Sequence, residues 1–125
     1  LVVATDGEFF KESNYGTSVE FLINGVALIP DVFTISQNYP NPFTSSTTID
    51  YDVPQTQHIA IRIYDIRGRL IKTLMNEEQN AGYKSITWDG TNDDGEKVSA
   101  GVYFYQMHTS NGESFTKSKR LLKLN

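Results

Sequence analysis

Two histidines and carboxylate pairs such as Asp50 with Asp52, or Glu77 with Glu78, are the residues of this sequence that could act in acid–base catalysis. His58 and His108 stand outside any recognisable nucleophile elbow or His-Glu-x-x-His helix. Asp50 and Asp52 alternate with apolar residues, which is the pattern of the solvated face of a strand and not of a catalytic pair. Cysteine is absent, so thiolate nucleophiles and thiolate metal sites are excluded. We therefore expect a protein without enzymatic activity.

An acidic, glycine-rich loop is the one candidate for a metal site. Carboxylates on such a turn are ligands that calcium accepts, and the loop offers Asp89, Asp93 and Asp94. Counted from Asp89, however, Thr91 occupies the third position and Asp94 the sixth, where an EF-hand-like loop requires glycine. The sequence favours turns closed by side-chain oxygens on backbone amides over a bound ion. No cofactor other than calcium is a candidate.

The aromatic residues raise the alternative of carbohydrate binding, since coplanar Trp and Tyr side chains can stack on sugars. Trp88 is the only tryptophan, and Tyr103 and Tyr105 share one face of an expected strand. Val102, Phe104 and Gln106 share the other face, so at least one of the two faces must enter the core. We expect the aromatic residues to serve the core and its rim and not a sugar platform. An Ig-like spacer or carbohydrate-binding module of an extracellular hydrolase remains the alternative function.

Composition sets the class of protein. The chain has 125 residues and a net charge of −4, which is the wrong sign for a generic binder of nucleic acid. No apolar run approaches the roughly 20 residues that cross a bilayer, so no membrane insertion is expected. We expect residues 1–30 to be the end of an upstream domain or a linker, with one added strand at residues 18–23 as an option, and residues 31–125 to be one domain.

Short runs of aromatic and β-branched residues, separated by Gly, Pro, Asn and Asp, predict an all-β fold. Seven strands set about 8 to 12 residues apart are typical of an Ig-like antiparallel β-sandwich, and a small closed barrel is the structural alternative. Residues 76–82 read as a polar loop and residues 110–112 as a hairpin turn. The expected strands cover residues 32–36, 47–53, 58–65, 70–75, 83–88, 101–108 and 113–124.

The last twelve residues carry four cations and no acid. Lysine on an edge strand commonly blocks pairing between sheets, and this is the structural interpretation. A terminal basic strand is also a segment that a partner can recognise, so a docking signal is the functional interpretation. The residues concerned include Lys117, Lys119, Arg120, Leu121, Leu122 and Lys123.

Several motifs, in this order along the chain, resemble one protein family. They are ISQNYPNPF at 35–43, STTI at 46–49, YDIRGR at 64–69, WDG at 88–90, GVY at 101–103 and the basic terminal strand. Together they resemble the type A C-terminal sorting domain of cargo proteins of the type IX (Por) secretion system. The segment 88–103 also resembles the Ig-like domain of the flagellar hook-capping protein.

The resemblance implies a sandwich appended to a secreted or surface-attached protein of a Gram-negative bacterium, which reaches its destination through the periplasm. It implies that the type IX translocon and a sortase-like peptidase are partners, together with a cargo domain upstream in the same chain. The recurrent family elements match Pro40, Asn41, Pro42, Gly101, Tyr103, Lys117 and Lys119. With the rest of the terminal strand, these residues form the expected recognition site.

Overall fold

Alternation of apolar and polar residues produces the first sheet of the sandwich. In the computed structural model, which describes residues 22–23, 26–27, 29–109 and 115–125, β4 (Thr47–Val53) is buried at every second position. It pairs antiparallel with β3 (Thr34–Ile35) on one side and with β7 (Gly82–Trp88) on the other. Since only one face of β4 is buried, this three-stranded sheet must cover a second layer.

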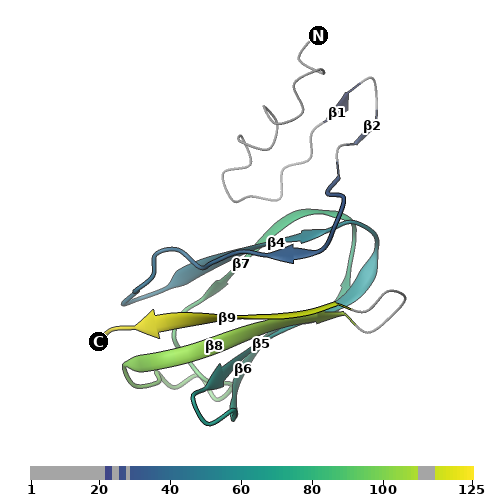
Figure 1. Cartoon of the computed structure of the whole chain (residues 1–125). Helices are drawn as coiled ribbons and strands as arrows, with labels where there is room; N and C mark the ends of the chain where they lie inside the picture. The colour runs from purple at the N-terminus through teal and green to yellow at the C-terminus, as the bar shows by residue number, and fades with distance from the viewer. Residues whose placement is uncertain (1–21, 24–25, 28, 110–114) are drawn as a thin grey trace.

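The second layer is a four-stranded antiparallel sheet in the order β6-β5-β8-β9 (Figure 1). Its central strands are β5 (Gln57–Asp65) and β8 (Gly101–Thr109), and its edges are β6 (Leu70–Gln79) and β9 (Phe115–Lys123). Two further short strands, β1 (Leu22–Ile23) and β2 (Val26–Ala27), pair with each other. The terminal basic strand is thus an edge strand, as the sequence predicts.

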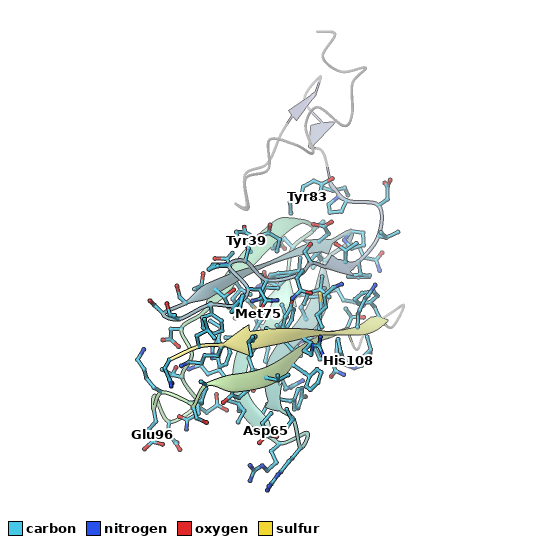
Figure 2. The ribbon with its side chains drawn as sticks, turned by 60° about the vertical axis from the view of Figure 1, so that its left-hand side comes forward. Tyr39, Asp65, Met75, Tyr83, Glu96 and His108 are labelled. Carbon is cyan, nitrogen blue, oxygen red and sulfur yellow. The ribbon has the colours of Figure 1, made fainter. Side chains whose placement is uncertain are left out.

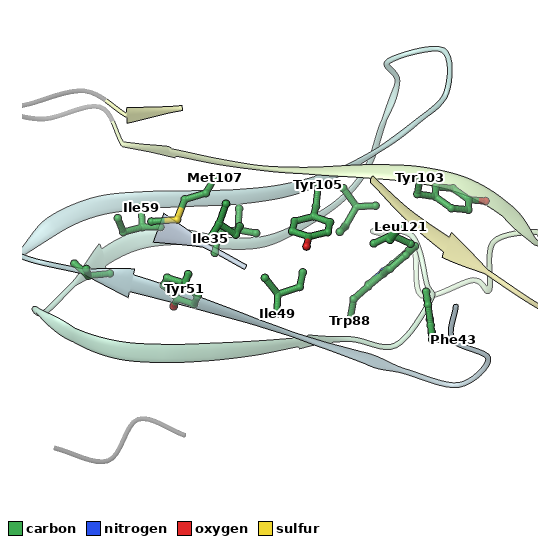
Figure 3. Packing of buried hydrophobic residues seen from close by; sticks show 13 residues of the cluster. Ile35, Phe43, Ile49, Tyr51, Ile59, Trp88, Tyr103, Tyr105, Met107 and Leu121 are labelled. Carbon is green, nitrogen blue, oxygen red and sulfur yellow. The ribbon is translucent and has the colours of Figure 1, made fainter. Parts of the chain in front are cut away.

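The core lies between the two sheets and is both aliphatic and aromatic (Figure 3). The isoleucines of β5 are fully buried because they share one face of the strand. Trp88 lies at the centre of an aromatic row, with its ring centroid 5.5 Å from that of Phe43 and 5.6 Å from that of Tyr103. Burial of each large side chain contributes on the order of 2 kcal/mol to folding. The three aromatic residues considered as a sugar platform, Trp88, Tyr103 and Tyr105, are all buried.

Strand β6 departs from simple alternation. Register shifts opposite Ile61/Arg62 and Ile63/Tyr64 insert two extra residues, Leu74 and Ile71, into the edge strand. Each bulge resets which side chains face inward, so Ile71, Leu74 and Met75 all pack against the core.

The predicted fold class is confirmed, because seven strands in two antiparallel sheets form an Ig-like sandwich and not a closed barrel. The expected loop at 76–82 is wrong for residues 76–79, which continue β6 and pair with β5 down to Gln79 opposite Gln57, and for Gly82, which begins β7 and pairs with Val53. The expected turn at 110–112 lies outside the described residues, as does most of the strand considered for residues 18–23. Within the described residues no helix is long and apolar enough to cross a membrane. The boundary at residue 30 stays a prediction.

Candidate functional site

A proline-rich corner between β3 and β4 is fixed in place by one buried asparagine. The Asn38 side-chain amide donates to Thr47 Oγ1 at 2.9 Å and to the Pro40 carbonyl at 3.2 Å. The backbone amide of Asn38 donates to the Tyr105 hydroxyl, 2.8 Å away. The Tyr39-Pro40 and Asn41-Pro42 peptide bonds are both cis. Although Asn38 lies within the quoted motif, its role was not predicted, because only the fold shows that its side chain is buried.

The corner is joined to the end of β9, about 80 residues further along the chain. Asn41 Oδ1 accepts the Leu122 amide at 3.0 Å, and the Phe43 amide donates to the Leu122 carbonyl at 3.1 Å. The Leu124 amide donates to the Phe43 carbonyl at 2.7 Å, which gives a parallel bridge between Phe43 and Lys123. The structure therefore brings two separately predicted recognition segments, the corner and the terminal strand, into one continuous surface.

The predicted recognition residues divide into exposed and buried sets. The corner residues Pro40, Asn41 and Pro42 are exposed, and Gly101 is half-buried. On β9, Lys117, Arg120 and Leu122 are exposed and Lys119 is half-buried. Tyr103, Leu121 and Lys123 point into the sandwich and are at most 6% exposed. The exposed residues are available to a partner, whereas the buried ones hold the surface in shape.

A pocket of about 390 Å³ lies where the corner meets β8 and β9. Its lining is mixed, because apolar side chains adjoin an amide and a guanidinium. The residues that line it are Asn41, Pro42, Val102, Arg120, Leu121 and Leu122. Four of these six residues lie on β9 or on its neighbouring strand β8, and none of the six is acidic. The pocket is suited to an apolar or acidic contact and lacks a group that could act as a base.

Lys123 is an unusual core residue that packs over the WDG turn. Only 4% of it is exposed, and a Cβ placed on Gly90 would lie 2.7 Å from its Cε and 3.7 Å from Phe43 Cε2. The Lys123 ammonium donates to the Leu124 carbonyl at 3.4 Å, so the charge stays near the chain end. Glycine is favoured at position 90 for two reasons. Its φ of +76° is one that L-residues rarely adopt, and any side chain there would meet Lys123.

The acidic loop uses its oxygens to close turns. Asp89 Oδ1 accepts from the Thr91 hydroxyl at 2.6 Å, and this hydrogen bond is the main reason why the pKa of Asp89 lies below its usual range. Asn92 Oδ1 accepts the amides of residues 94 and 96, and Asp93 Oδ1 accepts the Thr73 amide at 3.1 Å. Among the described residues, the side chains of Asp89, Asp93 and Asp94 belong to no group of three acidic, His or Cys residues suited to a metal ion.

The candidate acid–base residues lie apart from one another. His58 Nε2 is 2.7 Å from Asn76 Oδ1 on β6, and His108 Nδ1 is 2.7 Å from Thr116 Oγ1 on β9. The Tyr39 hydroxyl donates to both oxygens of Asp50, but burial outweighs this bond and raises the pKa of Asp50. In Figure 2, His108 and Tyr39 occupy different parts of the sandwich. Neither histidine forms a hydrogen bond or ion pair with a carboxylate in the described part of the chain.

Comparison with known families finds one matching family model for the sandwich. The family model of the FlgD Ig-like domain matches residues 40–113, more than half of the chain. The basal-body rod modification protein FlgD of Salmonella typhimurium is 36% identical over 70 residues, which cover 55% of this chain and 30% of FlgD. The chain thus spans less than a third of the length of the curated relatives it matches.

Two solved structures show the same fold. Dimeric latent PorU from Porphyromonas gingivalis has a TM-score of 0.60 and 21% identity, over 79% of this chain and 10% of PorU. FlgD from Xanthomonas campestris, described in terms of hook capping in flagellar assembly, has a TM-score of 0.54 and 23% identity, over 72% of this chain and 67% of that FlgD. At these identities the similarity establishes the sandwich fold.

Proposed function

For this chain, which belongs to the FlgD Ig-like domain family, we propose the role of a non-catalytic sorting domain. In this role it directs an attached cargo protein through the periplasm and across the outer membrane by the type IX secretion system, to the medium or to the cell surface. The observation that carries the proposal is the hydrogen-bonded contact between the proline corner and the terminal basic strand.

A partner that recognises a sorting signal after folding contacts residues on the surface of the domain, because the chain is no longer extended. Here two of the motifs that resemble the sorting family, the proline corner and the terminal basic strand, meet at one edge of the sandwich, although Asn41 and Leu122 are 81 residues apart in the sequence. The exposed residues of that edge are mostly basic or apolar. A translocon subunit can thus read the backbone edge and the cations together.

The test is export of a reporter. Residues 31–125, fused to a periplasmic reporter in a host with a working type IX system, should carry the reporter to the surface or medium. Reversing two exposed or half-exposed charges, with Lys117→Glu and Lys119→Glu, should reduce export, whereas Lys97→Glu in the exposed loop after β7 should not.

Deletion of the last ten residues gives the second arm of this test. Because the deletion removes most of β9, thermal unfolding of the same fusion is measured, and the charge variants supply the result if the truncated domain does not fold. Export that persists in the deletion or in the charge-reversed variants contradicts the proposal.

A role in assembly is the second candidate, and the 36% identity to Salmonella FlgD favours it. In that case the sandwich would hold structural subunits together and would not address a cargo. Replacing the Ig-like domain of FlgD with residues 31–125 and scoring motility distinguishes the two functions. Restored motility without reporter export supports the assembly role.

A further inference from the structure

The outer margin of β9 is divided into two unlike halves. Figure 1 shows β9 along the margin of the four-stranded sheet, where it pairs on one side with β8. In an antiparallel pair, successive residues turn their amide and carbonyl alternately toward and away from the neighbouring strand. The Leu122 amide and carbonyl bond to Asn41 and Phe43, so they point away from β8. By alternation the same groups of Thr116, Ser118 and Arg120 also point outward.

The proline corner closes the C-terminal half of this margin. It satisfies both outward groups of Leu122 and the amide of Leu124. Gln37 extends the closure by one step, because its Nε2 donates to the Arg120 carbonyl at 2.8 Å. An incoming strand therefore cannot pair beyond Arg120 without displacing the corner.

The N-terminal half of the margin is open. In the described part of the chain, the structure gives no hydrogen-bond partner to the outward amide and carbonyl of Thr116 or of Ser118, or to the amide of Arg120. Both Thr116 and Ser118 are exposed. The five residues from Thr116 to Arg120 span about 17 Å, which is enough for a short added strand. An exposed row of unpaired backbone groups is the usual template for strand addition.

The charges along this row decide which strand can be added. In a two-fold antiparallel pairing of two copies centred on Ser118, Lys117 of each copy would lie opposite Lys119 of the other. Like charges directly opposite each other destabilise a strand pair, so self-association is disfavoured. Opposite charges directly across from each other stabilise a strand pair. Since β9 contains no acidic residue that could neutralise its own cations, an acidic partner strand is favoured.

We propose that the open half of β9, from Thr116 to Arg120, binds an extended acidic segment of a partner protein by strand addition. The segment carries acidic side chains at alternate positions, opposite Lys117 and Lys119, and ends where the proline corner begins. This inference rests on the proposed function, because it names the partner chemistry of the recognition surface. Its test uses the 125-residue chain in solution, so binding can fail while export succeeds, and the reverse.

The experiment is an NMR titration of the isotope-labelled chain with a seven-residue peptide in which glutamate alternates with valine. Binding should shift the amide signals of Thr116, Ser118 and Arg120, and at saturation it should slow hydrogen exchange at these amides about tenfold or more, since they become paired. Raising the salt concentration should weaken binding, because exposed ion pairs are screened.

Matched controls separate strand addition from charge attraction. The same peptide with N-methyl groups on its valine nitrogens keeps its charge but loses the amides that face β9 when its glutamates lie opposite the lysines, and it should bind at least about tenfold more weakly. The variant Ser118→Pro removes an outward amide that the ladder with β8 does not use, and it should also abolish binding. Lys97→Glu should bind as the unaltered chain does, whereas Lys119→Glu should not.

Three results overturn the proposal. The first is equal binding of the plain and N-methylated peptides, and the second is equal binding of the glutamate peptide and a lysine–valine peptide. The third is a titration in which no signal of residues 116–120 moves. Because the N-methylated peptide is tested on the unaltered chain, the outcome does not depend on whether Ser118→Pro folds. Export of the reporter with no peptide binding would leave the sorting function standing and refute strand addition.

Discussion

Replacement of Gly90 by alanine tests whether the WDG turn is shaped around Lys123. The backbone angle of +76° costs an L-residue about 1 to 2 kcal/mol. The new Cβ would also lie 2.7 Å from Lys123 Cε, and overpacking of a buried site costs about 1 to 3 kcal/mol. Lys123 Cε is the far end of a flexible side chain, but only 4% of the residue is exposed, so it has little room to move away. We expect Gly90→Ala to lower the free energy of unfolding by about 2 to 5 kcal/mol.

Gly95 provides the matched control for this measurement. Its φ of +84° is similar, but a Cβ there would meet no atom within 4 Å. Urea unfolding followed by tryptophan fluorescence should therefore show a loss of only about 1 to 2 kcal/mol for Gly95→Ala. In a double-mutant cycle, Lys123→Ala should recover about 1 to 3 kcal/mol of the Gly90→Ala loss. Equal losses at Gly90 and Gly95, or no coupling to Lys123, would refute the steric argument.

Three further outcomes are expected. Tyr105→Phe removes a hydroxyl that accepts a hydrogen bond from the buried Asn38 amide. It should lower the free energy of unfolding by about 1 to 3 kcal/mol in urea titrations. An unchanged midpoint of urea unfolding would contradict this expectation. Burial raises the pKa values of Tyr51 and Tyr105 from 10.0 to about 12, so the unfolded chain loses these protons at a lower pH than the folded chain does. The free energy of unfolding should therefore fall between pH 10 and pH 12. Tyr105→Phe should make this fall smaller. Arg69→Ala breaks the ion pair between the exposed Arg69 guanidinium and the Asp65 carboxylate, and it should leave the unfolding midpoint unchanged. A clear drop in the midpoint would show that the pair stabilises the fold.

Strand positions were predictable where one face of a strand is buried and the other is wet. The segment 47–53 alternates without interruption, and β4 has the same bounds. Strand β6 was predicted only in part, because its two bulges change the period and its far end is polar. Residues 76–79 form a strand through backbone pairing with β5, to which their side chains contribute no apolar pattern. Edge pairing of this kind leaves little trace in composition.

The candidate site was predicted as two separate segments. The proline corner and the basic strand are recognisable as sequence motifs, but their contact depends on Asn41 and Phe43 reaching Leu122 across the sandwich. No local pattern encodes a hydrogen bond between residues so far apart in the chain. The burial of Lys123 was likewise beyond prediction, because a lysine near a chain end is ordinarily solvated.

By itself, the sequence determined the period of its strands, the absence of thiol chemistry, the net negative charge and the basic character of its last twelve residues, since these are properties of neighbouring residues or of the composition. Only the tertiary structure decided that half of the basic strand is closed by the proline corner and half is open. The reason is that the edge of a strand is open only where no other segment of the chain pairs with it. That depends on how two sheets stack and on where a distant corner comes to lie.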